Sequence, residues 1–342
     1  MNWLALDIGG ANIKTADGRG YAASHAFALW LHHQRLADKL RAIIAEAPPS
    51  DHLAVTMTGE LADCFTTKTE GVAFILRAVE RAADGRHTRV YLNNGDLVAP
   101  RIATARPLEA AASNWHALAT FCGRYAKSHT GLLIDIGSTT TDIVPLRGGQ
   151  PPHAGHTDLD RLLNQQLVYT GVARSPICAL VQTLPYHNVR CPVAQELFAT
   201  TRDVYLILED VPESTHDLHT ADRQPATIDA ACRRLGRMLS ADETQYNMTD
   251  AQAWAEDVAR VQLQMIIRAG LAVVAELGSA PRVIILSGQG EFLGRRVAER
   301  LAYAGTLVSL TEQLGAPLSR CAPAHALAVL ARESAQPGPS KP

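Results

Sequence analysis

The sequence predicts an α/β protein of two domains, and the prediction rests on a repeated hairpin and a later glycine turn. Two segments of equal length, residues 4–16 and 132–144, align without a gap and place Asp7 on Asp135. Each reads as a short apolar strand that ends in an aspartate, a tight turn containing glycine, and a second apolar run. At 342 residues the chain is long enough for two domains with separate cores. The repeat therefore predicts one phosphate-handling hairpin in each domain.

The two hairpin turns have the composition of an anion-binding loop. Glycine lets main-chain N–H groups come close to an anion, and a carboxylate at a strand end suits Mg²⁺ beside phosphates. A single loop of this kind is common in ordinary turns, but two matched copies favour phosphate binding. We therefore predict Asp7 and Asp135 as catalytic residues and metal ligands. The predicted phosphate-binding residues of the two turns are Gly9, Gly10, Asn12, Lys14, Gly137, Ser138, Thr139 and Thr140.

A third glycine element follows a predicted buried strand at residues 283–287. Gly288, Gln289 and Gly290 form a turn between this strand and an amphipathic stretch that ends near Leu301. A glycine turn at a helix N-terminus offers an anion bare backbone and the positive end of a helix dipole. The spacing is not that of a dinucleotide-binding fingerprint, and the sequence contains no P-loop motif. We therefore add these three residues to the predicted phosphate- or nucleotide-binding site.

The rest of the first half alternates helices and strands. Helices are predicted at residues 34–46, 71–83 and 107–127, and strands at residues 52–57 and 89–92. A hairpin followed by alternating strands and helices predicts a mixed sheet covered by helices. Residues 58–61 follow the strand at 52–57 directly. Glu60 and Lys68 are therefore expected to flank a strand-end loop that reaches a cleft.

The second half restarts with the repeated hairpin. Residues 148–249 are rich in Pro, His and Thr without a clear period, and we interpret them as an insertion that shapes a substrate pocket. Apolar residues recur at helical spacing over residues 250–277, and Gly278 is the expected C-cap. The predicted domains are therefore residues 1–127 and 128–335, followed by a disordered tail at 336–342.

Composition excludes several classes of function. With 47% hydrophobic and 19% charged residues, the chain has the profile of an ordinary globular protein. A formal net charge of −2 gives no broad attraction for nucleic acid or anionic membrane, and 5% aromatic residues are too few for base stacking. The six cysteines lack metal-type spacing, and no apolar run approaches the length of a membrane span. We expect free thiols, no nucleic-acid or membrane partner, and a cytoplasmic location.

The combination of motifs resembles known families. A duplicated aspartate–glycine hairpin with a late glycine turn resembles the sugar kinase, Hsp70 and actin superfamily, in which two ribonuclease-H-like domains lie around a central cleft. From residue 4 to about residue 332 the chain also resembles the hydantoinase/oxoprolinase-related proteins linked to tetrahydromethanopterin-dependent one-carbon transfer. The motifs that carry this resemblance are MTGELADCF at 57–65, ASNW at 112–115, DLDR at 158–161, LVYTGV at 167–172 and ELFATTRD at 196–203.

The resemblance implies a transferase of methanofuran-type cofactor biosynthesis. The expected reaction joins an (aminomethyl)furan-methyl diphosphate to the phenol oxygen of a γ-glutamyltyramine or tyrosine-like acceptor and releases diphosphate. Backbone N–H groups, Lys14 and Mg²⁺ would stabilise the leaving group. A phenol has a pKa of about 10 and needs a base, for which Asp142, Glu60 and Asp135 are the candidates. The expected substrate-binding residues are Lys68, Asn114, Tyr169 and Arg174.

Other functions are compatible with the same fold. An ATP-dependent small-molecule kinase, a hydantoinase- or oxoprolinase-type amide-ring hydrolase and a non-catalytic nucleotide-binding protein would share the phosphate-binding turns. Under these alternatives ATP would be the cofactor. Under the leading hypothesis the partners are a small-molecule diphosphate and a phenolic acceptor, and a homodimer is possible.

Overall fold

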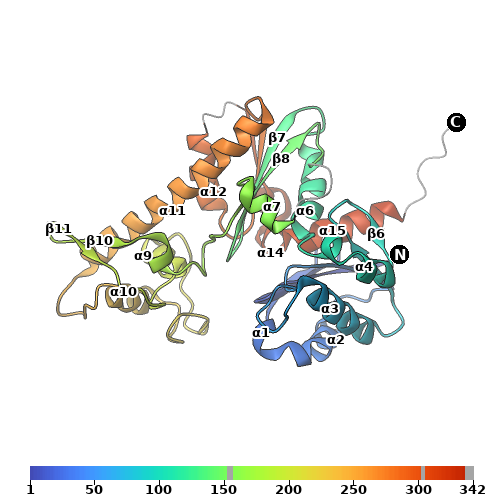
Figure 1. Ribbon diagram of the computed structural model, residues 1–342, viewed down its shortest axis with the longest axis horizontal. Helices are drawn as coiled ribbons and strands as arrows, with labels where there is room; N and C mark the ends of the chain where they lie inside the picture. The colour runs from blue at the N-terminus through green and yellow to red at the C-terminus, as the bar shows by residue number, and fades with distance from the viewer. Residues whose placement is uncertain (152–156, 302–304, 336–342) are drawn as a thin grey trace.

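Two β-sheets lie at the centre of the structure, a computed structural model that describes residues 1–151, 157–301 and 305–335 (Figure 1). The first sheet has the strand order β3-β2-β1-β4-β5-β6, and the second has the order β13-β12-β7-β8-β9. The tail predicted as disordered lies outside the described residues. The strands of the first sheet are β1 (Trp3–Ile8), β2 (Asn12–Ala16), β3 (Ala22–Ala26), β4 (His52–Met57), β5 (His87–Tyr91) and β6 (Leu97–Val98). Those of the second are β7 (Thr130–Ile136), β8 (Thr141–Arg147), β9 (Leu167–Val168), β12 (Val283–Ser287) and β13 (Thr306–Ser309).

The two sheets repeat one topology. In each, the first strand pairs antiparallel with the second and parallel with the fourth, and the fifth strand lies parallel to the fourth. The third strand pairs antiparallel with the second in both sheets. This order, third–second–first–fourth–fifth, is that of a ribonuclease-H-like domain. The predicted fold class, with two such domains, is therefore confirmed.

Helices cover both faces of both sheets. The first seven α-helices of the described residues are α1 (Leu29–His32), α2 (Leu36–Glu46), α3 (Lys68–Ala83), α4 (Pro100–Ala105), α5 (Pro107–Ala110), α6 (Asn114–Cys122) and α7 (Asp158–Leu163). The later ones are α8 (Ile177–Leu180), α9 (Thr201–Ile207), α10 (Ile228–Arg237), α11 (Met248–Leu277), α12 (Glu291–Arg300), α13 (Leu310–Leu314), α14 (Ala316–Arg320) and α15 (Ala322–Ser334). Short 3₁₀ turns follow α1 at His33–Arg35 and α6 at Gly123–Tyr125.

The alternation of side chains in β1 explains how the layers form. Leu4 and Leu6 lie in the core with α2 and α3, whereas Ala5 faces α15 together with Ala54 of the neighbouring strand. Small side chains on that face let α15 approach the sheet closely. The second sheet packs α11 and α12 on one face and α6 and α15 on the other. Helix α15 therefore contributes to the cores of both sheets (Figure 1).

The chain segments exchange helices across the predicted boundary at residue 127. The first sheet ends at β6 and the second begins at β7, which agrees with a division of the strands there. However, α6 packs on the second sheet, and α15 packs on β1, β2 and β4 of the first. The independence of the two predicted domains stays a prediction, since each sheet uses a helix from the other segment.

Two predicted helices differ from the observed ones. The helix predicted at 107–127 is broken into α5, α6 and a 3₁₀ turn, because Ala112 has a positive φ of 47°. Helix α3 begins at Lys68 instead of residue 71, since the Thr67 side chain caps it by accepting from the Glu70 N–H at 3.1 Å. The long helix α11 ends as predicted at Gly278, which has a φ of 75°.

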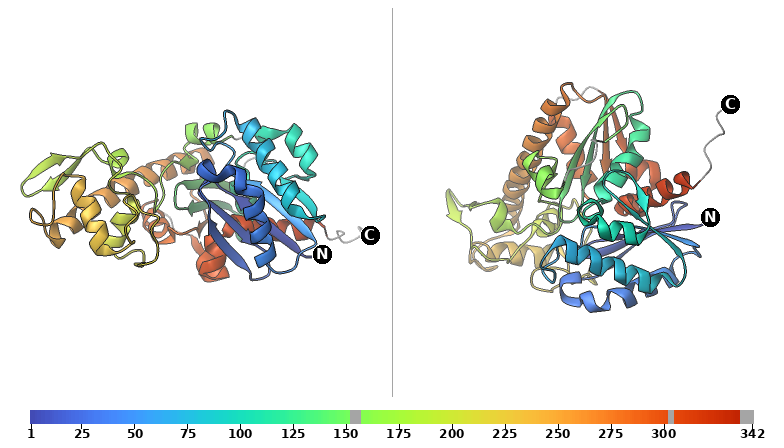
Figure 2. Two further views of the ribbon diagram at one scale, coloured as in Figure 1. Left: turned by 90° about the horizontal axis from the view of Figure 1, so that it is seen from below. Right: turned by 45° about the vertical axis from the view of Figure 1, so that its right-hand side comes forward.

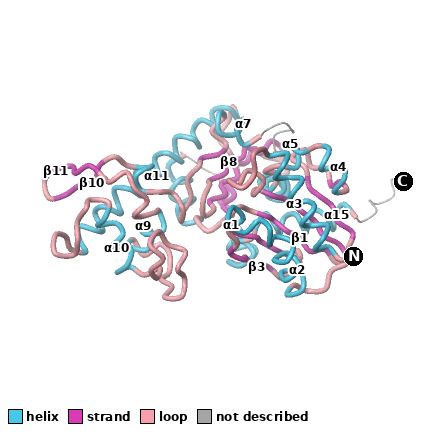
Figure 3. The backbone as a smooth tube through the Cα atoms, turned by 60° about the horizontal axis from the view of Figure 1, so that its bottom comes forward, coloured by secondary structure: helices cyan, strands magenta, loops and turns pink. Residues whose placement is uncertain are grey.

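The predicted insertion forms a separate lobe at the far end of α11 (Figure 2). Strand β9 pairs with β8, so the first part of residues 148–249 belongs to the second sheet. The lobe itself contains α8, α9, α10 and the hairpin of β10 (Thr183–Tyr186) and β11 (Val189–Pro192). These elements pack on the N-terminal half of α11 (Figure 3).

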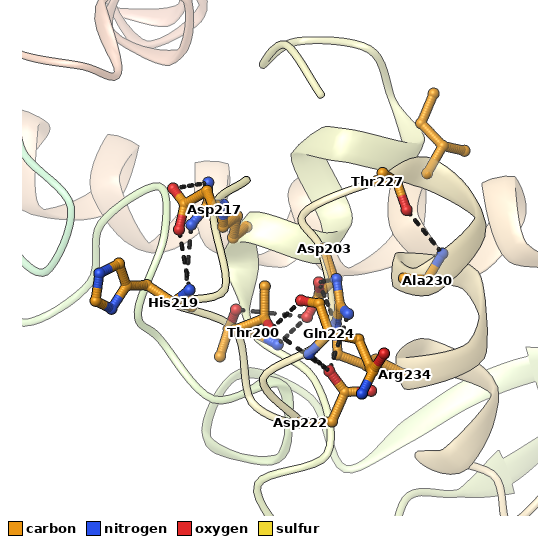
Figure 4. A network of polar contacts seen from close by, with 12 residues as sticks. Thr200, Asp203, Asp217, His219, Asp222, Gln224, Thr227, Ala230 and Arg234 are labelled. Atoms are coloured by element: carbon orange, nitrogen blue, oxygen red, sulfur yellow. Dashed lines mark hydrogen bonds and ion pairs between the residues drawn. The ribbon is translucent and has the colours of Figure 1, made fainter. Parts of the chain in front are cut away.

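A buried ion-pair network fixes the lobe (Figure 4). Arg234 of α10 has no exposed surface, and its Nε donates to Asp203 of α9 at 2.8 Å. Its Nη1 donates to Asp222 of the intervening loop at 3.1 Å. A buried charge must be paired in this way to avoid a large desolvation cost. We interpret this network as structural.

Helix α11 is long and apolar enough, by length and composition, to cross a membrane, which the sequence analysis did not expect. The most apolar window has a mean hydropathy of 1.5 and is 39% buried. Core helices of globular proteins meet the same criterion. Trp254, Val258 and Ile266 of α11 are buried against the second sheet and the lobe, so one face of α11 packs in a hydrophobic core.

Candidate functional site

The two predicted hairpins form with matching turns. The Gly9 N–H donates to the Asn12 carbonyl at 3.0 Å, and the Gly137 N–H donates to the Thr140 carbonyl at 2.9 Å. Asp7 lies at the end of β1, and Asp135 lies at the equivalent position of β7. The charges of both hairpins act on one another, since Lys14 and Asp142 influence the ionisation of both aspartates. We call these two turns, with Asp7 and Asp135, the paired-hairpin site.

Burial changes the acid strength of both aspartates. Asp7 is 4% exposed, and burial raises its pKa to about 6, against the opposing effects of Lys14 and of a hydrogen bond to the Asn114 side chain. Burial raises the pKa of Asp135 to about 6 as well, with a further increase from the charge of Asp142. One oxygen of the buried Asp7 carboxylate has no hydrogen-bond partner within the described residues. A carboxylate in that state is available to a cation or a proton.

The third glycine turn packs directly on the second hairpin. Gly288 has a φ of 89°, and a Cβ at this position would lie against the Ile136 carbonyl oxygen and 2.7 Å from Asp135 Oδ1. The Gly290 N–H donates to the same carbonyl at 2.9 Å. Ser287 pairs with Asp135 in the sheet register. The predicted element therefore reaches the paired-hairpin site, although the Gln289 side chain is exposed. Its role in phosphate binding stays a prediction.

Glu60 belongs to a second group of charged residues, which lies beside the hairpins. It is 2% exposed, and burial raises its pKa to about 7, with Asp158 adding to the increase and Lys68 opposing it. The Ala112 N–H hydrogen bonds to its carboxylate. The second carboxylate oxygen, Oε2, has no partner in the described part of the chain. The structure thus brings Glu60 and Lys68 together, as the sequence analysis expected.

The segment Ala112–Trp115 links the separate parts of the site. Ala112 contacts Glu60, the Ser113 hydroxyl lies 2.7 Å from the Thr56 hydroxyl, and Asn114 contacts Asp7. The Trp115 ring packs under the guanidinium of Arg161 at 4.3 Å. The positive φ of Ala112 is the bend that allows one short segment to reach all of these groups. Asn114, predicted to bind substrate, contacts a predicted catalytic carboxylate, and its role with a substrate stays a prediction.

Arg161 is a site residue that the sequence analysis missed. It is 2% exposed, and its guanidinium is hydrogen bonded and ion paired with Asp142. The same side chain reaches Asp158 at 3.3 Å and the Gln166 carbonyl at 3.3 Å. The Asp142 carboxylate is already hydrogen bonded and ion paired with this guanidinium, so it is the least available of the three candidates to take a proton from a substrate. The DLDR motif at 158–161 contained the signal, but sequence alone does not pair it with Asp142.

The remaining predicted substrate residues lie at the edge of the site. The Arg174 N–H donates to the Ser138 carbonyl at 3.0 Å, which ties this residue to the second turn. Its guanidinium lies 5.3 Å from the ring centre of Trp30, a residue that the sequence analysis did not consider. Tyr169 is 70% exposed and has no polar side-chain contact with the described residues of either hairpin. The structure therefore brings Arg174 to the site but not Tyr169.

The carboxylates of the paired-hairpin site suit a metal ion that binds together with a phosphate ligand. They suit a metal ion held by protein side chains alone less well. Within the described residues, no group of three or more His, Cys, Asp and Glu side chains is placed to hold a metal ion. Mg²⁺ is often bound by one or two carboxylates together with substrate phosphates and water. Asp7 and Asp135 meet this smaller requirement.

The fold and the site place the chain among known proteins. The profile of the hydantoinase/oxoprolinase family matches residues 51–333. The chain belongs to this family. It is 32% identical over 330 residues, 96% of each chain, to the (4-{4-[2-(γ-L-glutamylamino)ethyl]phenoxymethyl}furan-2-yl)methanamine synthase of Methanocaldococcus jannaschii. A protein of the same name from Methanococcus vannielii is 27% identical over 201 residues, which cover 58% of this chain and 89% of that protein.

Solved structures with a similar course of the chain include actin-like and kinase proteins. An archaeal actin homologue in complex with ADP aligns with a TM-score of 0.47 at 14% identity, over 97% of this chain and 100% of that one. A Listeria monocytogenes protein described as a putative N-acetylmannosamine kinase aligns with a TM-score of 0.47 at 11% identity, over 98% and 100% of the two chains.

Proposed function

We propose that this protein is a transferase of methanofuran-type cofactor biosynthesis. It would join a furan-methyl diphosphate to the phenol oxygen of a γ-glutamyltyramine or tyrosine-like acceptor and release diphosphate. The single observation that carries the proposal is the pair of matched glycine turns, each with a strand-end aspartate, in a chain that aligns with the named synthase over 96% of its length.

The donor end of the reaction requires groups that bind a diphosphate. The turn N–H groups of both hairpins and the Lys14 ammonium would hold the phosphate oxygens, because they combine close backbone approach with a positive charge. Asp7 and Asp135 would hold Mg²⁺, which neutralises charge on the leaving group when it is bound. Both aspartates have raised pKa values near 6 in the protein alone, and a nearby cation would favour their ionised forms.

The acceptor end requires a base, and we assign this role to Glu60. Its pKa of about 7 is the closest of the candidates to neutral pH, and its Oε2 lacks a partner within the described residues. In the proposed step Glu60 takes the phenol proton and the phenol oxygen forms a bond to the furan methylene carbon. The bond from that carbon to the diphosphate oxygen breaks, and diphosphate leaves with the electron pair. Lys68 and Asp158 tune the charge of this base.

The proposed function is consistent with a cytoplasmic protein that does not use ATP. All six cysteines are free thiols in the structure, which agrees with a reducing cytoplasmic compartment. No ATP is needed for the displacement, since the diphosphate itself is the leaving group.

The test is to incubate the protein with furfuryl diphosphate and γ-glutamyltyramine in Mg²⁺, with tyrosine and tyramine as further acceptors, and to measure pyrophosphate release. We expect ether formation and pyrophosphate in equal amounts without ATP, competitive inhibition by added pyrophosphate, and no reaction of furfuryl alcohol. A strict requirement for ATP, with its γ-phosphate on the product or released as phosphate, would favour a kinase or amide-ring hydrolase instead.

A further inference from the structure

Two side chains from opposite halves of the chain meet at the edge of the paired-hairpin site. Trp30 belongs to α1, and Arg174 belongs to the loop after β9; the guanidinium carbon lies 5.3 Å from the centre of the indole ring. Each residue is tied to one hairpin turn through the backbone. The Leu29 N–H donates to the Gly10 carbonyl at 2.9 Å, and the Arg174 N–H donates to the Ser138 carbonyl at 3.0 Å. The pair therefore lies beside both predicted phosphate turns.

The backbone on both sides of the pair is fixed. Leu29 is fully buried next to Gly59, where a Cβ would lie 2.7 Å from Leu29 Cδ2. On the other side, Gly171 packs against the second turn so closely that a Cβ would lie 2.5 Å from the Gly137 carbonyl oxygen. Gln262 of α11 donates to the Gly171 carbonyl at 2.9 Å. Rigid supports of this kind are what a recognition site needs.

The two side chains are available to a ligand. Arg174 is exposed and forms no ion pair with any residue of the described ranges. Trp30 is partly exposed, whereas the other three tryptophans, Trp3, Trp115 and Trp254, are only 7%, 3% and 1% exposed. An arginine without a carboxylate partner in the described ranges, whose guanidinium lies over a partly exposed indole ring, matches a ligand with an aromatic ring and a carboxylate.

We propose that Trp30 and Arg174 form the acceptor subsite, with the indole ring against the phenol and the guanidinium on the α-carboxylate of a glutamyl or amino-acid group. This inference rests on the proposed function and adds the part of the substrate that the chain recognises. The product named for the relatives contains a phenoxy ring and a γ-glutamyl group, so an acceptor of that class carries both features. Tyramine has the ring but no carboxylate.

Binding tests the subsite without turnover. Because Trp30 is the least buried tryptophan, we expect γ-glutamyltyramine to change the tryptophan emission excited at the red edge of the absorption band, and Trp30→Phe to remove this change. We expect Arg174→Met to weaken binding of γ-glutamyltyramine about tenfold and to leave tyramine binding within about twofold, since only the former loses a charged hydrogen bond. Arg300→Met, at the exposed end of α12, is the matched loss of one surface cation.

Kinetics separate failure of the subsite from failure of the proposed function. In Trp30→Phe and Arg174→Met we expect the KM for γ-glutamyltyramine to rise and the KM for furfuryl diphosphate to stay unchanged. Both KM values should stay unchanged in the control Arg300→Met. Arg174→Lys should recover only part of the loss, because lysine lacks the bidentate fork. Unchanged discrimination between the two phenols in an active Arg174→Met enzyme would overturn the subsite. No pyrophosphate release by the wild type with either phenol would overturn the proposed function, and the emission change would then still decide whether the subsite binds such ligands.

Discussion

Lys14 in the first hairpin occupies the register position that Asp142 occupies in the second. Asp7 pairs across the strands with Lys14, and Asp135 pairs with Asp142. The backbone is therefore duplicated but its charges are not. An acid beside a base leaves the first hairpin neutral, whereas two acids at the second require an external cation, which Arg161 supplies to Asp142. We infer that the hairpins divide the work, with Lys14 as the cation that acts on the buried aspartates and that would also face the phosphate.

Lys14→Met should weaken diphosphate binding much more than acceptor binding. A buried or half-buried charge on phosphate contributes about 1.5 to 3 kcal/mol, so the inhibition constant of pyrophosphate should rise roughly tenfold to a hundredfold. The measurement is the competitive inhibition of ether formation by added pyrophosphate. Lys127→Met, at an exposed position beyond α6, provides the control. Equal inhibition constants in both variants would place the phosphate elsewhere.

Asp7→Asn should abolish most turnover and stabilise the ligand-free protein at high pH. The ordinary pKa of this carboxyl is 3.8, and burial raises the pKa to about 6 in the folded state. Between these values the folded chain binds more protons than the unfolded chain, so stability is full below pH 4 and falls as pH rises through 6. Removing the charge should therefore stabilise the protein by about 3 kcal/mol at pH 8.

Urea unfolding of wild type and Asp7→Asn from pH 4 to pH 8 measures this effect. The two proteins should have similar stability at the acid end, diverge between about pH 4 and pH 6, and keep a constant difference at higher pH. A variant that is less stable than wild type at pH 8 would contradict a net cost of burying the Asp7 charge.

Arg161→Met should destabilise the fold, in contrast to Asp7→Asn. The guanidinium is 2% exposed and pairs with Asp142, whose side chain is 14% exposed. Removing one partner of a buried pair leaves an uncompensated charge and costs about 3 to 5 kcal/mol. The double variant Arg161→Met with Asp142→Asn should recover much of this loss, and urea unfolding at pH 7 measures both single variants and the double variant. Additive losses in the double variant would show that the pair is not coupled.

Gly288→Ala should lower the thermal stability of the protein, whereas Gly10→Ala should leave it unchanged. Gly288 has a φ of 89°, and its Cβ would lie 2.7 Å from Asp135 Oδ1, so the substitution strains the backbone and displaces the carboxylate. No heavy atom lies within 4 Å of a Cβ built on Gly10, and its φ is ordinary. The midpoint temperature of thermal unfolding should therefore fall for Gly288→Ala and stay unchanged for Gly10→Ala. Any loss of pyrophosphate affinity in Gly10→Ala at unchanged stability would report on the phosphate turn itself.

The strands and hairpins could be predicted because their signals are local. Each aspartate ends an apolar run and precedes a glycine, and this order specifies a strand followed by a turn. The strand at residues 52–57 was predicted with the observed ends, and α11 ends at the predicted glycine. Period and turn residues act within a few positions of the chain, so these elements do not depend on distant partners.

Only the tertiary structure decided which charges meet. The break at Ala112 follows from contacts with Glu60, Thr56 and Asp7, which lie far from it in sequence, and so the helix predicted through this region was wrong. The pairing of Arg161 with Asp142 depends on how α7 packs beside β8. The meeting of Trp30 with Arg174 joins the two halves of the chain. The sequence alone determined the repeated hairpin and its residue types. The choice among the carboxylates required the fold, because acid strength depends on burial and on neighbours that no local pattern encodes.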